Sequence, residues 1–389
     1  MMWEKKKLND CCLSIADGDH QPPPKAESGV PFVTIANIVD NKFDFSNTMF
    51  ATESYYASLD SKRKAQVGDV LYSVVGSFGI PVLITDEQRF VFQRHIAILR
   101  CNKKILLPEY LYYTMLTRDF YMMADTVALG AAQRTISLTA LRNMEIPVPP
   151  LEIQEKIVEK ALPYDALIEN NKKQIKLLEE AAQRLYKEWF VDMRFPGYEN
   201  TPIVNGVPDG WKKQKLIELA DVQYGFAFDG TLFNSDGMGT PIIRIRNIPS
   251  GTTGDFTTED APTQYRVYNG DILVGMDGEF HINSWCGDEA YLVQRTCRFK
   301  PVDEKMKGWL LYAIYEPIKF FEKTVVGATV AHLGKKHIDS IELLTGPKQL
   351  YEPFQLYFEK RQILLNQNKR LAEARNRLLP KLMNGEIEI

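Results

Sequence analysis

The chain has few cysteines and no long apolar stretch. Its five cysteines are odd in number and form no CxxC pair, so neither a disulfide framework nor a paired-cysteine zinc site is predicted. No run of about 18 apolar residues occurs, which excludes a membrane-spanning helix. The start, MMWEKKKLNDCC, carries basic residues without an apolar core behind them and does not match a secretory signal. These absences predict a reducing, cytoplasmic setting and no membrane contact.

Catalytic motifs are also missing. The sequence has no GxSxG, no HExxH and no Asn/Asp-Pro-Pro-aromatic motif of the kind that a methyltransferase acting on base amino groups would need. The string closest to a phosphate-binding loop, residues 327–337, has six residues between its glycines, and Lys336 stands where Ser or Thr would contact Mg²⁺. The sequence therefore predicts that this chain is not an enzyme and binds neither a metal nor a cofactor.

Length and charge set the broad class of protein. With 389 residues, the chain is predicted to hold about two to three domains. Its net charge of −3 argues against nucleic-acid binding through bulk charge alone. Local clusters of basic residues remain compatible with such binding.

Two stretches with heptad spacing organise the chain. From Ile168 onward, apolar residues recur at intervals of three and four, with Asn171 as the polar position that fixes register. Residues 349–389 repeat this spacing, so the two helices are predicted to pack on each other; the alternative is that each packs only on its own domain. Pro163 predicts a short helix from Glu152 to about Ala161, followed by a long one to Phe190, about 40 Å in length. The predicted interface residues are Ile168, Ile175, Leu178, Leu185, Trp189, Leu364, Leu371 and Leu378.

The sequence between these helices is repeated. Residues 67–79, VGDVLYSVVGSFG, match residues 269–281, NGDILVGMDGEFH, at an offset of 202, and the offset falls slowly to 197 at Gly130 and Gly327. Each copy opens with a Trp-Lys-containing string, at Trp3 and at Trp211. Strands are predicted at 30–39, 69–75, 81–85, 95–100, 241–248, 271–276 and 291–299, and helices at 108–124 and 308–321.

This pattern predicts an α+β fold: two similar mixed domains separated by a pair of long antiparallel coiled-coil helices, with a pseudo-two-fold internal repeat. The predicted boundaries are 1–150 and 199–347 for the two mixed domains, and 151–198 and 348–389 for the helical spacers. If both mixed domains bind DNA and the helices hold them about 40 Å apart, they would meet DNA segments separated by about one helical turn, roughly 34–36 Å.

Polar side chains in loops are the candidates for DNA contact. Gln and Arg suit adenine and guanine edges, glycine loops permit close backbone approach, and an exposed Phe can wedge between bases. Solvated surface loops, and structural turns with a buried Phe, are the competing interpretations. The candidates are His20, Lys25, Ser77, Phe78, Arg94, Gln133, Arg134, Tyr224, Arg244, Arg246, Asn247, Phe280, Arg295 and His332.

Several strings resemble one known family. LYKEWFVD at 185–192, followed by RFPG at 194–197, resembles the centre of the specificity subunit of type I restriction–modification systems. PDGWKKQKL at 208–216, PPLEIQEKI at 149–157 and LLPKLMNGEI at 378–387 fit the same family, although Pro353 stands where the first copy has Lys156. The resemblance covers essentially the whole chain.

The resemblance implies two target-recognition domains that each read half of a gapped site in double-stranded DNA. It also implies that the helices dock two methyltransferase (modification) subunits, which would use S-adenosylmethionine, and that restriction/translocase subunits join this core. A similar module in another methyltransferase–nuclease arrangement is one alternative. A coiled-coil scaffold that assembles partners without reading DNA is another.

Overall fold

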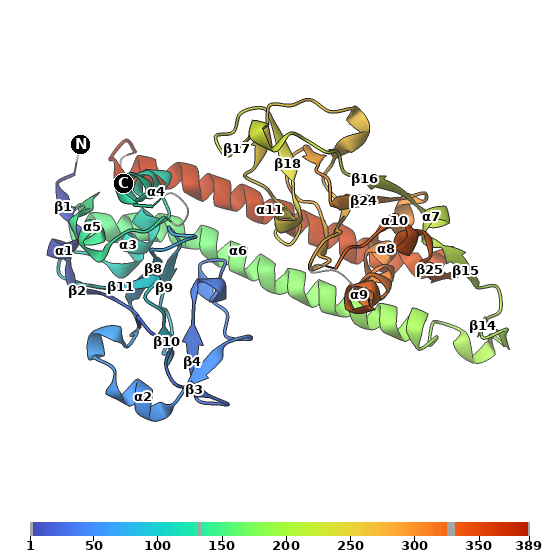
Figure 1. Ribbon diagram of the computed structural model, residues 1–389, viewed down its shortest axis with the longest axis horizontal. Helices are drawn as coiled ribbons and strands as arrows, with labels where there is room; N and C mark the ends of the chain where they lie inside the picture. Colours follow the sequence, from blue (N-terminus) through green and yellow to red (C-terminus); the bar gives the residue numbers. More distant parts are fainter. Residues whose placement is uncertain (1–2, 131–133, 325–330, 388–389) are drawn as a thin grey trace. The chain divides into compact units, whose positions relative to one another are not determined.

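The computed structural model describes residues 3–130, 134–324 and 331–387 (Figure 1). The chain divides into two compact units, the first formed by Met1–Leu167 with Leu371–Ile389 and the second by Ile168–Arg370. Each unit combines strands, short helices and a segment of each of two long helices. The predicted mixed α and β architecture with two long helices is confirmed. The finer division into four domains stays a prediction.

Short antiparallel strands dominate the first unit. They are β1 Lys5–Lys7, β2 Cys12–Asp17, β3 Lys25–Ala26, β4 Val30–Val33, β5 Ile38–Val39, β6 Lys42–Phe43, β7 Met49–Ala51, β8 Asp69–Ser73, β9 Pro81–Leu83, β10 Val91–Phe92, β11 Ile96–Cys101 and β12 Glu145–Pro147. One sheet has the order β2-β11-β8-β9 and is antiparallel throughout. A second has the order β10-β4-β7-β3, in which β10 and β4 are parallel. The pairs β1–β12 and β5–β6 complete the set seen in the described residues.

The central sheet of the first unit is buried on both faces. Successive side chains of a strand point to opposite faces. In β8, Val70 and Tyr72 join the core that also holds Tyr110 and Phe120, whereas Leu71 joins the core that holds Phe92 of the second sheet. Each such side chain contributes about 1.5–3 kcal/mol through burial, which explains why this strand is a continuous apolar run in the sequence.

The second unit has a sheet of the same strand order. Its strands are β13 Ile203–Val204, β14 Val207–Pro208, β15 Lys212–Lys215, β16 Ala220–Tyr224, β17 Phe233–Asn234, β18 Thr240–Ile243, β19 Phe256–Thr257, β20 Arg266–Val267, β21 Ile272–Gly275, β22 Ile282–Ser284, β23 Ala290–Leu292, β24 Thr296–Pro301 and β25 Glu342–Thr345. The order β16-β24-β21-β22 is antiparallel throughout. The second sheet follows the order β17-β19-β18-β23-β20, and β15 pairs with β25 as β1 pairs with β12. In β21, Ile272 and Val274 face one core and Leu273 another.

The helices packed on these sheets are shorter than the sequence predicts. Residues 108–124 are two helices because Thr117 caps a new helix by accepting the N–H of Phe120. The segment predicted at 308–321 is likewise divided into α8 and α9. The short α-helices are α1 Leu8–Cys11, α2 Glu53–Ser58, α3 Pro108–Met115, α4 Arg118–Val127, α5 Leu138–Asn143, α7 Leu216–Leu219, α8 Lys307–Ala313, α9 Tyr315–Thr324 and α10 Lys335–Asp339.

Three predicted strands are also shorter in the structure. Strand β4 ends at Val33, and a 3₁₀ turn follows in which the Asn37 side chain accepts the Thr34 N–H at 2.9 Å. Strand β18 ends at Ile243 in the same way, with Asn247 accepting the N–H of Arg244 at 2.8 Å. An Asn side chain that bonds a nearby N–H gives the backbone an alternative to the ladder. Residues 291–299 are two strands, β23 and β24, with a turn between them.

The first long helix is α6, Leu151–Tyr186, which continues as a π-helical turn, Lys187–Val191. The predicted break at Pro163 is wrong, since the helix runs through it. A proline inside a helix removes one hydrogen bond and clashes with the carbonyl of residue i−4. Pro163 is exposed, so water can reach the carbonyl that loses its partner. Ala161, two residues before Pro163, is buried in the core of the first unit and holds the helix there.

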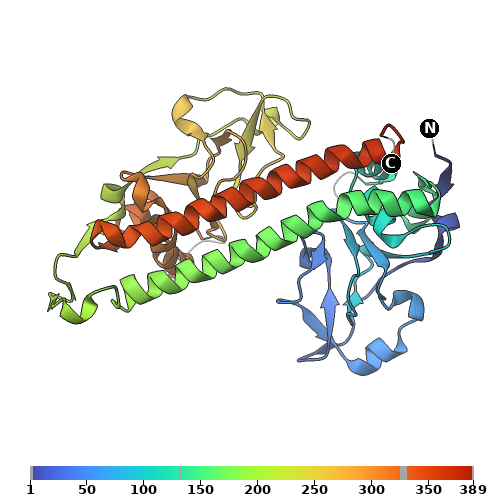
Figure 2. The same cartoon turned by 180° about the vertical axis from the view of Figure 1, so that it is seen from behind.

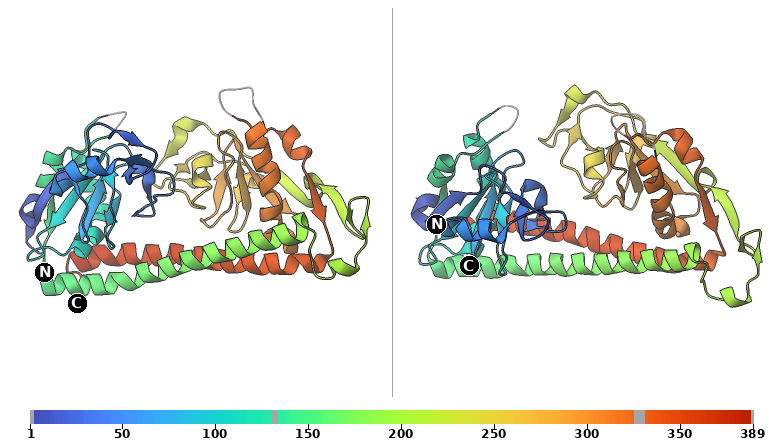
Figure 3. Two further views of the ribbon diagram at one scale, coloured as in Figure 1. Left: turned by 90° about the horizontal axis from the view of Figure 1, so that it is seen from below. Right: turned by 60° about the horizontal axis from the view of Figure 1, so that its bottom comes forward.

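The second long helix, α11, spans Glu352–Met383 and lies beside α6 in each unit (Figure 2). In the second unit Asn171 donates to Asn368 at 2.9 Å, and Tyr186 packs edge-on against Phe354. In the first unit Arg375 pairs with Asp165. Higher residue numbers in α6 pair with lower residue numbers in α11, so the two helix segments are antiparallel. Figure 3 shows the strands of each unit standing on its part of this helix pair.

All eight predicted interface residues are buried or half-buried. Ile175 is buried at 9% exposure. Leu185 and Trp189 pack against the core of the second unit, and Leu378 packs against the core of the first. The remaining four, Ile168, Leu178, Leu364 and Leu371, are half-buried. Within the described parts of the chain, no helix combines the length and apolar character needed to cross a membrane.

Candidate nucleic-acid interface

Parallel pairing of short strands brings candidate loops to one edge of each unit. In the second unit β18 and β23 run parallel, with Ile243 opposite Leu292. The carboxyl ends of parallel strands meet at the same edge, so Arg244 and the turn that carries Arg295 leave the sheet together. In the first unit β4 and β10 are parallel in the same way, which places the turn that carries Arg94 at the corresponding edge.

Three side chains meet at this edge of the second unit. His332 Nδ1 lies 2.5 Å from Asp277 Oδ1, and Arg295 Nε lies 3.4 Å from Asp277 Oδ2. Backbone bonds fix the arrangement, because Gly278 N–H donates to Ala331 O at 3.0 Å and Leu333 N–H to Met276 O at 2.7 Å. The Arg295 and His332 side chains remain 56% and 46% exposed. The structure therefore brings together two of the predicted residues, Arg295 and His332, around a carboxylate.

Hydrogen-bond chemistry determines what this cluster presents to a ligand. A carboxylate only accepts, so His332 donates from Nδ1 to Asp277, and the neutral ring leaves Nε2 as an acceptor. Arg295 also lies 3.3 Å from His332 Nδ1, but that nitrogen already carries the donated proton, so Asp277 is the effective partner of Arg295. Arg295 has a backbone φ of 70°, which costs a non-glycine residue about 1–2 kcal/mol. The cluster thus holds a forked donor beside an acceptor.

The other candidates in the second unit are engaged locally. Arg246 Nη2 donates to Asp255 Oδ1 at 2.5 Å, and Arg244 lies over the Phe233 ring at 5.7 Å. Asn247 uses its carbonyl oxygen on the Arg244 backbone. These three residues do not continue strand β18, because they belong to the 3₁₀ turn and its N-terminal cap. Arg246 remains 62% exposed and is the most accessible of the three.

A loop network holds the candidates of the first unit. His20 Nε2 lies 2.9 Å from Asp17 Oδ2, and Arg63 lies 3.5 Å from both Asp17 and Asp19. Tyr55 donates its hydroxyl to Asp19 at 3.0 Å, and burial first, then this bond, raises the pKa of Tyr55. The loop 17–20 is therefore ordered by Arg63 and Tyr55, while His20 stays on its exposed side.

Arg94, Ser77 and Lys25 are exposed. Arg94 donates its backbone N–H to Asp19 O at 2.9 Å, so its turn lies against the loop that carries His20. Ser77 follows β8, and its carbonyl accepts the Ser73 hydroxyl at 2.9 Å. Lys25 opens β3. These placements keep all three side chains available to a ligand.

Arg134 has a structural role in the fold. Its guanidinium lies 3.2 Å from the Asp125 carboxylate and donates to the carbonyl of Ala128 at 3.3 Å. These groups lie at the carboxyl end of α4, where carbonyls lack helical partners and attract cations. Base contact by Arg134 stays a prediction that competes with this bonding. Gln133, also predicted, lies outside the described residues.

Three aromatic candidates are placed in or against the protein interior, and this corrects their proposed exposure. Phe78 is 9% exposed and stacks on Tyr121 with ring centroids 5.5 Å apart. Phe280 is fully buried in the core of the second unit. The hydroxyl of Tyr224 is buried, and burial raises the pKa of Tyr224 to about 12. Apolar rings contribute more by filling these cores than by exposure to water, and the buried-turn alternative is the one observed.

Two residues of these networks were not predicted as site residues. Asp277 orients Arg295 and His332, and Arg63 organises the loop of His20. The signals were present in the sequence as the DGEFH string and the basic run SKRK at 61–64. Neither string shows which side chain pairs with which. Over the described residues, no cluster of His, Cys, Asp and Glu suited to a metal ion occurs, and the five cysteines are free thiols.

Known proteins similar to this chain are type I specificity subunits. Residues 2–180 match the family model of the type I restriction modification DNA specificity domain. A specificity subunit of the type I restriction enzyme MjaIX from Methanocaldococcus jannaschii is 27% identical over 419 aligned positions, covering 100% of this chain and 94% of that protein. This chain is similar to type I specificity subunits along its whole length. The specificity subunit of the HindI enzyme from Haemophilus influenzae is 23% identical and covers 99% of both chains.

One solved structure gives the same fold for a specificity subunit. The crystal structure of the type I restriction–modification S subunit from M. genitalium superposes with a TM-score of 0.50 at 14% sequence identity, covering 100% of this chain and 96% of that one. At this identity the likeness concerns the fold. It shows that a specificity subunit of comparable length has the fold of this chain.

Proposed function

We propose that this chain is a specificity subunit that reads a bipartite, gapped site in double-stranded DNA, with each unit recognising one half. The observation that carries this proposal is the exposed Asp277–Arg295–His332 cluster, which offers donors and an acceptor from three loops at one sheet edge. Arginine donates two parallel bonds to guanine, and an imidazole accepts from an exocyclic amine or, when protonated, donates. The similarity to type I specificity subunits and to the DNA specificity domain model supports the DNA-specificity role independently.

We infer that the two units are copies of one reader with different contacts. Both have a sheet of matching strand order, and Gly76 and Gly278 share a φ of 69° in the loops after β8 and β21. Isolated bridges join the same loops to Thr135 in one unit and to His332 in the other. The equivalent side chains differ, as two readers of different half-sites require. The pseudo-two-fold relation between the copies belongs to this proposal.

The partners follow from the same proposal. The long helices would separate the half-sites and dock two methyltransferase subunits that use S-adenosylmethionine, and restriction/translocase subunits would join in the cytoplasm. This chain would supply specificity without catalysis. The alternative, a coiled-coil scaffold without DNA readout, is less well supported because it gives no reason for the exposed Arg295 to be held at a left-handed φ beside Asp277.

Substitution of Arg295 tests the assignment. Arg295→Ala and His332→Ala in the assembled methyltransferase should each relax one half-site by about 1–3 kcal/mol and leave the other half-site unchanged. The matched control is Lys300→Ala, an exposed residue near the far end of β24, which should leave the methylated sequence unchanged. The readout is sequencing of modified bases in DNA methylated by each variant. If both site variants methylate the same DNA motif as the wild type, the assignment is wrong. If the wild type shows no preference among DNA sequences, the scaffold alternative is favoured.

A further inference from the structure

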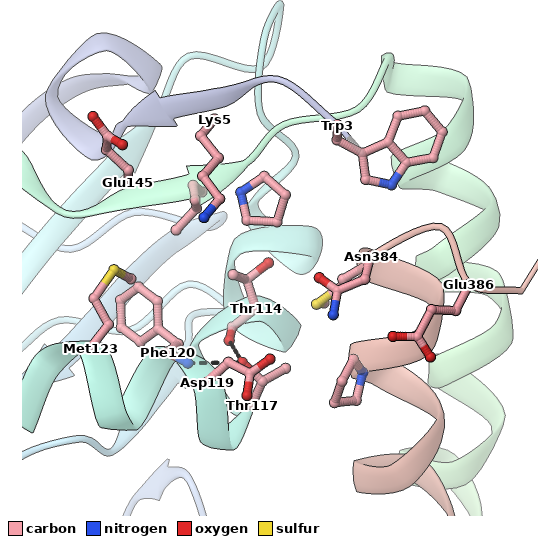
Figure 4. Close-up of a pocket in the computed structure, with 14 residues that line it drawn as sticks. Trp3, Lys5, Thr114, Thr117, Asp119, Phe120, Met123, Glu145, Asn384 and Glu386 are labelled. Carbon is pink, nitrogen blue, oxygen red and sulfur yellow. Dashed lines mark hydrogen bonds between the residues drawn. The ribbon is translucent and has the colours of Figure 1, made fainter. Parts of the chain in front are cut away.

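A cavity of about 640 Å³ lies in the first unit, and none of the described candidate DNA-contacting residues lines it (Figure 4). Strands β1 and β12, helix α4 and the end of α11 form its walls. Phe120 and Met383 provide apolar surface. Trp3 stands at one side, and its indole N–H is buried without a hydrogen-bond partner among the described residues. A buried donor left unsatisfied costs about 1–3 kcal/mol, so an acceptor that enters the cavity gains by pairing with it.

The rim of the cavity is acidic. Asp119, Glu145 and Glu386 line it and are exposed to water, whereas Lys5 is the one basic residue among the described residues of its lining. Figure 4 shows these carboxylates spread around the opening, on α4, on β12 and after the end of α11. Three carboxylates against one ammonium favour a cationic group at the mouth. The cavity therefore combines an aromatic and apolar interior with a negative rim.

The second unit shows what fills the corresponding position there. Trp211 precedes β15 as Trp3 precedes β1, and β15 pairs with β25 as β1 pairs with β12. Phe195 covers the Trp211 ring with centroids 4.7 Å apart, and Phe190 lies at 5.2 Å. Phe195 belongs to the segment Arg194-Phe195-Pro196, in which a basic residue precedes the aromatic one.

A single position explains why the two units differ. A Cβ on Gly346 would lie 2.8 Å from the Trp211 ring, so the ring rests directly on that backbone. In the first unit Pro149 occupies the equivalent place, two residues after β12 and one before a proline. A proline there does not offer the bare glycine backbone on which the Trp211 ring rests, and Trp3 lines a cavity.

We propose that this cavity docks a segment of a partner protein in which an aromatic residue stands beside Arg or Lys, as Phe195 stands beside Arg194. The aromatic ring fills the apolar interior against Trp3 and Phe120. A backbone carbonyl of the segment accepts the Trp3 indole N–H, and the basic side chain meets the acidic rim. The proposal is independent of DNA readout, since none of the residues proposed to contact DNA lines the cavity.

A peptide copied from the chain itself is the first probe. Fluorescein-labelled MRFPGYE, residues 193–199, should bind the full-length protein saturably, with a Kd tighter than about 1 mM. The Phe→Ala version of the peptide should bind at least tenfold more weakly, because a buried aromatic anchor dominates such contacts. Asp119→Asn in the protein should weaken binding about threefold through charge alone while keeping the fold. Absence of saturable binding, or equal binding of both peptides, overturns the proposal.

Photo-crosslinking in the native complex identifies the occupant. A benzophenone amino acid replaces Met123, which lines the cavity, and in a matched control replaces Met122, which is 48% exposed and is not among the lining residues. The expected result is a crosslink from position 123 to a partner segment with an aromatic residue within two positions of Arg or Lys. This crosslink should be lost when Trp3→Ala is added to the same protein. The benzophenone at position 122 should not form it. Crosslinks only within this chain, or only between copies of it, overturn the proposal; the methylated DNA motif stays readable in the same samples, so failure here leaves the DNA assignment standing.

Discussion

Arg361 tests how the second unit is held to its helix. The residue lies on α11 and is 7% exposed. Its guanidinium donates three hydrogen bonds, from Nε to Glu179 at 2.6 Å, from Nη1 to the Ser284 hydroxyl at 2.6 Å and from Nη2 to Asn283 Oδ1 at 2.7 Å. Glu179 is on α6, whereas Ser284 and Asn283 are on β22, so one side chain joins both long helices to the sheet of this unit.

Replacement by methionine keeps the apolar stem and removes the charge. Each bond to a charged group contributes about 1.5–3 kcal/mol when its loss leaves a buried group unpaired. Here the loss is partly compensated. The Ser284 hydroxyl still donates to Gln362 at 2.9 Å, Asn283 Oδ1 still accepts the Ser284 N–H at 2.8 Å, and the Glu179 side chain is 36% exposed and can be hydrated. The expected destabilisation of Arg361→Met is therefore about 2–4 kcal/mol, below the sum of three separate bonds.

Tryptophan fluorescence during urea unfolding measures this effect. Of the five tryptophans, all but Trp3 belong to the second unit, so the signal reports chiefly on that unit. Arg370→Met, at an exposed arginine on the same helix, is the control and should change stability by less than about 0.5 kcal/mol. Arg361→Lys should recover less than half of the loss, because one ammonium cannot reproduce the planar fork. A loss below about 1 kcal/mol for Arg361→Met would refute the reasoning.

Two further predictions concern the helices and pH. Ile175→Ala, at a buried position of α6, should destabilise by about 2–4 kcal/mol, whereas Leu177→Ala, at a side chain that is 65% exposed, should change little; equal unfolding midpoints would contradict the antiparallel packing. Burial, then the neighbouring Arg94, lowers the pKa of His95 below its ordinary 6.5, so the unfolded chain takes up this proton first and stability is lost as pH falls from about 6.5 through the lower folded value. His95→Gln should flatten that part of a thermal-unfolding profile between about pH 7.5 and 5.5, and an unchanged slope would count against it.

Periodic features of the sequence predicted the architecture well. The heptad positions identified two helices that do lie together, because an apolar stripe must be covered wherever it occurs. A local signal of another kind is Ser137, whose hydroxyl caps α5 by accepting the Ala140 N–H at 3.1 Å. Such signals are local, because a single side chain or a short spacing in the sequence suffices to predict the helix.

Features that depend on tertiary contacts were mispredicted. Pro163 lies inside α6 because packing on both sides of it outweighs one lost hydrogen bond at an exposed position. Phe78 and Phe280 share their loops with exposed residues, yet both rings turn inward. The pairing of Arg295 with Asp277 joins residues from different loops, and only the sheet register brings them together. Residue chemistry suggested which side chains could contact DNA. It could not show which of them are already bonded to other groups of the protein.

The polar groups between the long helices and the sheets point to orientation as a selected property. In the first unit Asp165 accepts the Tyr113 hydroxyl at 2.8 Å and pairs with Arg375. In the second, Arg361 and Gln362 are both buried and bonded to β22 or the residue after it. Removing one member of such a network is costly, whereas replacing all of its members by apolar residues of similar size is often neutral, so the net contribution of the network to stability is small. We infer that these groups fix one geometry between each sheet and its helices. On the proposed function, the sheet edge that meets DNA must be held at one angle to the long helices of its unit. Variants such as Arg361→Met should therefore lose discrimination at the second half-site at temperatures where the unit remains folded, and unchanged discrimination there would leave the network with a purely stabilising role.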